Sequence, residues 1–100
     1  DEKYGNASHS YTMEFVDTEG RQVMVGIDFQ RGPIAEVGIN GVTNEALLAL
    51  LIDRMEGFQS GAFACSENAE ALKFLQLALE WFKIRTEKRV ARGVEGTNTL

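Results

Sequence analysis

The sequence predicts an α+β fold, with an N-terminal three-stranded antiparallel β-meander followed by a C-terminal two-helix hairpin. Between residues 10 and 39, apolar side chains alternate with polar ones, and this period of two is typical of strands with one buried face. Between residues 43 and 92, apolar side chains instead recur at three- and four-residue spacing, which is typical of helices. The 100 residues contain no repeat and no linker-like segment, so we expect a single domain over residues 1–100.

The β-meander is predicted from three short segments that turn residues separate. Tyr11, Met13 and Phe15 alternate with polar residues, and Asp, Gly and Pro interrupt the pattern twice. The predicted segments are a loose terminus at 1–9, a strand at 11–16, a turn at 17–20, a strand at 23–29, a turn at 30–33 and a strand at 34–39.

The helical hairpin is predicted over residues 43–92, followed by a tail at 93–100. Thr43 is a plausible N-cap for a first helix that runs to about Gly57. Ser66 is a plausible cap for a second helix that ends near Arg92, where Gly93 can adopt a left-handed conformation.

The second helix has apolar residues on two faces. One face carries Leu72, Leu75, Leu79 and Phe82, and outside it lie Phe74, Leu77, Trp81 and Ile84. One face can pack on the first helix and the sheet, so we expect the other to meet another subunit of a homo-oligomer.

Composition excludes several classes of protein. The formal net charge of -5 and the pI near 4.8 argue against binding to polymeric nucleic acid. No apolar run reaches the roughly 18 residues of a membrane-spanning helix. Cys65 is the only cysteine, so neither an intrachain disulfide nor a cysteine-based zinc cluster can form, and a reducing cytoplasm is the expected compartment.

Basic residues gather near the end of this acidic chain. Residues 83–92 hold five basic side chains and one acid, a balance of +4 that leaves -9 on the other ninety residues. Arg85, Arg89 and Arg92 follow i, i+4, i+7 spacing and project from one side of a helix, where like charges repel. Acids of a neighbouring chain could relieve this repulsion, and so could a phosphate held by paired guanidinium hydrogen bonds.

Two other residues are candidates for ligand contact. Phe58 is either a core aromatic or, next to the small residues Gly57, Gly61 and Ala62, a ring on which a base stacks. Asn68 is a cap, a solvated side chain or a ligand-binding amide at a helix N-terminus, which favours anions. No nucleophile–base pair, metal-ligand spacing or phosphate-loop motif is present, so we predict no catalytic residue, metal or cofactor.

Two segments, NGVTNEALLALLIDRMEGFQSGAFACSENAEAL and RTEKRVARGVEGT, resemble the phage Thoeris anti-defence sponge family. That family shares its helical-hairpin domain with the phage sponges that counter cyclic-oligonucleotide (CBASS) immunity. The resemblance is close over residues 40–97 and looser over the strands. It implies a non-enzymatic protein of the host bacterial cytoplasm that sequesters the cyclic ADP-ribose signal, glycocyclic ADP-ribose, without cleaving it.

The resemblance also implies roles for individual residues. Phe58 would stack on the adenine, Asn68 would make polar contacts, and Arg85 and Arg89 would contact base or phosphates. Arg92 would add to these contacts, and the tail from Gly93 to Thr97, with Thr97 among the binding residues, would border the pocket. Ser66 departs from the family, where many members have FACRE in place of FACSE, which leaves one auxiliary charged contact without its residue.

The family's assembly is a dimer that can build a hexamer as a trimer of dimers, and some members hold cyclic trinucleotides at a separate site. Three alternatives therefore remain: a sponge mainly for cyclic di- or trinucleotides, a small phage protein-interaction module whose arginines pair with a partner's acids, and an enzyme that hydrolyses the signal.

Overall fold

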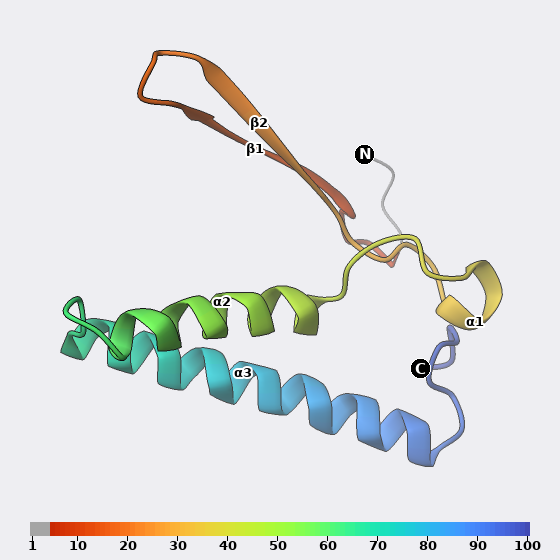
Figure 1. The fold of residues 1–100 in the computed structure, drawn as a ribbon. Helices are drawn as coiled ribbons and strands as arrows, with labels where there is room; N and C mark the ends of the chain where they lie inside the picture. The colour runs from red at the N-terminus through yellow and green to blue at the C-terminus, as the bar shows by residue number, and fades with distance from the viewer. Residues whose placement is uncertain (1–4) are drawn as a thin grey trace. The chain divides into compact units, whose positions relative to one another are not determined.

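The computed structural model describes residues 5–100, which form two compact units (Figure 1). The first unit runs to Thr43 and includes the tail Gly96–Leu100, and the second is Asn44–Glu95. In chain order the elements are strand β1 (Ser10–Val16), strand β2 (Gln22–Asp28), helix α1 (Ile34–Val37), helix α2 (Asn44–Gln59) and helix α3 (Ser66–Ala91).

The first unit is built on an antiparallel hairpin of β1 and β2, as the alternating sequence predicts. The register places Tyr11 opposite Ile27, and it carries Met13 and Phe15 onto the same face. Tyr11 also packs edge-on against Phe29, with ring centroids 5.7 Å apart. This face is only partly covered, since Tyr11, Met13 and Phe15 are each about half exposed.

The carboxylate of Asp17 holds the turn between the two strands. Its Oδ1 accepts hydrogen bonds from the backbone N–H groups of Glu19 and Arg21, both at 2.9 Å, and its Oδ2 pairs with Arg21 Nε at 2.9 Å. Gly20, with φ of 80°, supplies the left-handed residue that the turn requires. The hydrogen bond from the Arg21 backbone is the main cause that lowers the pKa of Asp17 below its ordinary value of 3.8.

Replacing Asp17 by alanine is expected to weaken the hairpin at neutral pH. Because the folded pKa is lowered, the carboxylate stabilises the turn well above pH 3.8, and this contribution is lost as the pH falls through the lowered pKa. Amide exchange in the ladder of β1 and β2 should therefore differ strongly between wild type and Asp17→Ala at pH 7 and converge in acid. A difference that is equally large at both ends of the titration would show that the charge of Asp17 is not involved.

The predicted third strand is wrong, because residues 34–37 form the one-turn helix α1 and the sheet has two strands. Pro33 has φ of -72° and its carbonyl accepts hydrogen bonds from Glu36 and Val37, which starts the helical turn. Gly38, with φ of 75°, ends it. Over residues 5–100 the fold is therefore a two-stranded hairpin followed by three helices, in place of a three-stranded meander and two helices.

Side-chain amides replace the ladder that a third strand would have made. Gln30 Nε2 donates to the carbonyl of Gly38 at 2.8 Å, and Gln30 Oε1 accepts from the backbone N–H of Asn40 at 2.9 Å. Asn40 binds both the N–H and the carbonyl of Arg31, each at 2.8 Å. Phe29 and Val42 form a single parallel bridge, which joins the two ends of the segment that contains α1.

The second unit is the helical hairpin of α2 and α3, which lie side by side in Figure 1. Ile52 is the buried residue of α2, with 7% of its surface exposed. Gln59 closes the loop at residues 60–65, because its side-chain amide binds both the N–H and the carbonyl of Cys65 at 3.1 Å. The first helix extends two residues past Gly57, where we expected its end.

The two ends of α3 differ in how well they were predicted. Ser66 is the first helical residue and Cys65 is the N-cap, so Ser66 is not the cap we expected. At the other end, Gly93 has φ of 73° and its N–H donates to Val90, while the N–H of Val94 donates to Arg89. These two bonds form a Schellman motif, which confirms the predicted left-handed closure at Gly93.

The second unit leaves many large apolar side chains exposed. Between 41% and 77% of the surface is exposed for Leu50, Leu51, Phe63, Phe74, Leu77, Trp81 and Val90. Single exposed apolar residues are normal, whereas a dense set of them is typical of interaction surfaces. None of the helices within residues 5–100 has a stretch that is both long enough and apolar enough to cross a bilayer.

Candidate ligand-binding site

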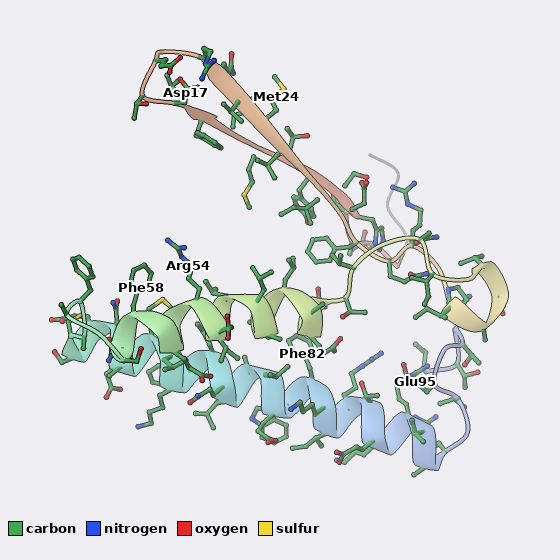
Figure 2. The ribbon with its side chains drawn as sticks, in the orientation of Figure 1. Asp17, Met24, Arg54, Phe58, Phe82 and Glu95 are labelled. Carbon is green, nitrogen blue, oxygen red and sulfur yellow. The ribbon has the colours of Figure 1, made fainter. Side chains whose placement is uncertain are left out.

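The three arginines at the end of α3 have different surroundings. Arg89 is buried at 9% exposure, its Nη2 donates to the carbonyl of Val94 at 3.0 Å, and its Nε pairs with Glu95 Oε2 at 3.3 Å. Figure 2 shows Glu95 where the chain leaves α3. An acid of the same chain therefore already compensates one charge of the row, and Arg89 also helps to hold the closure of its own helix.

Arg85 lies one turn earlier and is exposed. Among residues 5–100, no group forms a hydrogen bond or ion pair with its guanidinium. Arg92 is the C-cap residue of α3 and is also exposed. Of the three, Arg85 is thus the arginine whose donors are best placed to take a ligand anion without breaking a contact of the fold.

Phe58 belongs to a small cluster at the other end of the helical hairpin. The guanidinium carbon of Arg54 lies 4.9 Å from the centroid of the Phe58 ring, and the ring of Phe63 packs edge-on with a centroid distance of 6.4 Å. Figure 2 shows Arg54 and Phe58 rising from the same side of α2. Phe58 is half-buried, whereas Phe63 is 77% exposed. Part of the Phe58 ring is therefore exposed, and a base that displaces the Arg54 guanidinium can stack on its face.

Arg54 and Phe63 are not among the binding residues predicted from the sequence. For Arg54 a signal existed, because Arg54 and Phe58 are separated by four residues on a helix and must be neighbours on its surface. For Phe63 no periodic signal was available, because it lies in the loop at residues 60–65.

Asn68 lies in the first turn of α3, across that loop from Phe58, and it is half-buried. The carboxylate of the preceding residue, Glu67, lies in the first turn of α3, at the positive end of the helix dipole. Its pKa is lowered from the ordinary value of 4.5, chiefly by its own backbone N–H and then by the hydroxyl of Ser66, which donates at 3.2 Å. The anion-favouring end of α3 thus already has a carboxylate of its own, and Asn68 is left as a neutral amide beside it.

The helical hairpin places the predicted binding residues in two groups that are far apart. Asn68 and Arg85 are 17 positions apart on the continuous helix α3, and at about 1.5 Å per residue they are about 25 Å from each other along its axis. Phe58 lies with Asn68 beside the loop, and Arg89 lies beyond Arg85. One compact cyclic nucleotide cannot contact both groups within a single chain.

Thr97 belongs to the first unit, and there its Oγ1 accepts a hydrogen bond from the N–H of Thr99 at 3.2 Å. The neighbouring Gly96 carbonyl accepts from Ala35 at 3.0 Å, which attaches the tail to α1.

The first unit also contains a hollow of about 180 Å³, lined by Ser10, Asp28, Phe29, Arg31 and Asn40. Its polar groups bond to one another, since Ser10 Oγ donates to Asp28 Oδ1 at 2.9 Å and Asn40 binds the backbone of Arg31. None of the predicted binding residues lines it. Within residues 5–100, no cluster of three or more His, Cys, Asp or Glu side chains is arranged to hold a metal ion.

Comparison with known proteins finds similarity over the helical hairpin and over the arginine-containing segment that follows it. Residues 22–87 match the Acb2/Tad1 hairpin domain, which covers β2 to most of α3. The chain belongs to the Acb2/Tad1 hairpin family. It is also 43% identical over 95 residues to a protein of Bacillus phage SBSphiJ7 named Thoeris anti-defense 1. This confirms the resemblance that NGVTNE and the arginine motif indicate.

The extent of these matches bears on the site. The Acb2/Tad1 hairpin includes Phe58, Asn68 and Arg85, whereas Arg89, Arg92 and Thr97 follow it. The alignment with the Bacillus phage protein takes in 95% of this chain but 66% of that relative. The chain thus spans about two thirds of the length of the curated relative that it matches.

Proposed function

We propose that this chain is a phage anti-defence protein that binds the cyclic ADP-ribose signal of Thoeris, glycocyclic ADP-ribose, and withholds it without cleaving it. The similarity to Thoeris anti-defense 1 over 95 residues carries this proposal. The chemistry of the site agrees with it, because an accessible ring at Phe58 suits an adenine and the arginines of α3 suit a pyrophosphate. Such a protein acts in the cytoplasm of the infected host cell.

The binding site is built from two copies of the chain. Phe58 and Asn68 lie at one end of the helical hairpin, and Arg85, Arg89 and Arg92 lie at the other, about 25 Å away along α3. An antiparallel pair of hairpins brings the aromatic end of one copy to the arginine end of its partner, and it does so twice. The exposed apolar residues of α2 and α3 supply the surface for this pairing, with Phe74, Leu77 and Trp81 in one stripe.

In this arrangement Phe58 stacks on the adenine, Asn68 hydrogen-bonds the ligand, and Arg85 takes a phosphate with its available donors. Arg89 already pairs with Glu95. To contact the ligand, its guanidinium either binds both groups at once or exchanges the Glu95 carboxylate for the ligand's anion. Arg92 adds a further cation to these contacts, and Thr97 stays a predicted binding residue. The dimers assemble further into a hexamer, in which a second site can hold cyclic trinucleotides.

Calorimetric titration tests the function. The purified protein is titrated with glycocyclic ADP-ribose and with a panel of cyclic di- and trinucleotides, and bound ligand is then released by heat and weighed by mass spectrometry. We expect tight binding of glycocyclic ADP-ribose and release at its original mass. Stronger binding of the cyclic oligonucleotides, with competition for one site, would favour a sponge for those signals instead.

The same experiment separates the other classes of function. A changed ligand mass would identify an enzyme. An absence of binding across the panel would contradict the sponge and would make the arginines a surface for a partner protein.

A further inference from the structure

We infer that Arg54 is a further ligand-binding residue, which contacts the anionic group of the nucleotide whose base stacks on Phe58. This inference rests on the proposed function and adds a cation at the aromatic end of the site. Its starting point is the contact of the Arg54 guanidinium with the Phe58 ring at 4.9 Å (Figure 2).

Arg54 is an exposed arginine without acidic neighbours on its own helix face. The positions three and four residues away along α2 are Leu50, Leu51, Gly57 and Phe58, and none of them can pair with a guanidinium. Among residues 5–100 it makes no hydrogen bond or ion pair, so the ring of Phe58 is its partner. All five N–H donors of Arg54 are thus available to an anion.

The contact with Phe58 places this cation beside the ring that is proposed to hold a base. An exposed cation–π contact is weak, of the order of 0.5–1 kcal/mol, so an incoming base can displace the guanidinium from the ring at small cost. A displaced Arg54 remains within one helical turn of the ring and meets the charged part of the same ligand. Arginine matches phosphate geometry through paired hydrogen bonds, whereas adenine alone offers it no charge.

The position of Arg54 also separates its role from that of Arg85. Arg54 belongs to the chain that contributes Phe58, and Arg85 in the proposed pairing comes from the partner copy. A diphosphate between them receives a cation from each chain. The two arginines therefore act on one ligand from opposite sides.

The experiment compares wild type with Arg54→Gln and Arg54→Lys, titrating each with glycocyclic ADP-ribose at low and high salt. We expect Arg54→Gln to bind about tenfold more weakly or worse, because a charge-assisted contact is lost, and to show a smaller dependence on salt. Arg54→Lys keeps the charge but not the planar fork, so it should retain the salt dependence and recover part of the affinity.

Lys73→Gln is the matched control, since Lys73 is another exposed cation of the same unit and its loss changes the net charge equally. It should bind like wild type. If Arg54→Gln binds within twofold of wild type, or more tightly, Arg54 is only a cover for the ring and the inference is wrong. If wild type itself binds no member of the panel, the proposed function fails instead, and the two failures are thereby distinguished.

Discussion

Replacing Arg85 by alanine is expected to weaken the binding of glycocyclic ADP-ribose by about 1.5–3 kcal/mol, which is roughly a tenfold to hundredfold loss of affinity. The guanidinium is exposed and has no acceptor among residues 5–100, so its donors are free to meet a phosphate. The melting temperature should stay close to that of wild type for the same reason. Calorimetry and a thermal melt on the same sample measure both quantities.

Arg89→Ala provides the contrast for this prediction. Its guanidinium holds Val94 and Glu95 from a buried position, so this substitution should lower the melting temperature as well as the affinity. Lys83→Ala removes an exposed charge from the same part of α3 and serves as the control. An Arg85→Ala protein with wild-type affinity would exclude Arg85 from the site.

Gly41→Ala is expected to destabilise the first unit by about 3 kcal/mol, the largest effect on stability that we predict. A Cβ atom at this position would lie 2.4 Å from the carbonyl carbon of Phe29 and 2.7 Å from the carbonyl oxygen of Asp28. Both are backbone atoms, so no side chain can move aside. The bonds from Val42 to Asp28 and from Gln30 to Val42, each 2.9 Å, would have to break or shift.

Gly26→Ala is the matched control for Gly41→Ala. Gly26 lies in β2 of the same unit, and a Cβ atom there would meet nothing within 4 Å. Amide exchange should show lost protection around Phe29 and Val42 in Gly41→Ala and native protection in Gly26→Ala. Equal protection in the two variants would mean that the approach of the Phe29 backbone to Gly41 is not retained in solution.

The sequence predicted the elements whose pattern is local and continuous. The first two strands follow from alternation over seven residues each, and the closure of α3 follows from Gly93. The prediction of a third strand was wrong because the segment from Ile34 to Ile39 is too short for its periodicity to distinguish a strand from a helix. In addition, Pro33 starts a helical turn. The hydrogen bonds that the side-chain amides of Gln30 and Asn40 form join residues about ten positions apart, and no periodic pattern in the sequence indicates them.

The types of residue in the candidate site were easier to predict than their environments. An aromatic ring and a row of arginines are visible in the sequence. The burial of Arg89 depends on Glu95, which reaches it only because the chain reverses at Gly93. The distance between Asn68 and Arg85, in contrast, follows from the sequence once α3 is recognised as continuous, and the proposed two-chain site rests on it.

A mixed oligomer tests this two-chain site most directly. Phe58→Ala and Arg85→Ala chains, each with a different tag, are co-expressed and the mixed dimer is isolated through both tags. In a two-chain site, one pocket of the mixed dimer carries both substitutions and the other carries neither. We predict that each variant alone binds glycocyclic ADP-ribose poorly, whereas the mixed dimer binds it with wild-type affinity at half the wild-type stoichiometry. A mixed dimer that binds as poorly as its parents would contradict a site in which Phe58 of one chain meets Arg85 of the other.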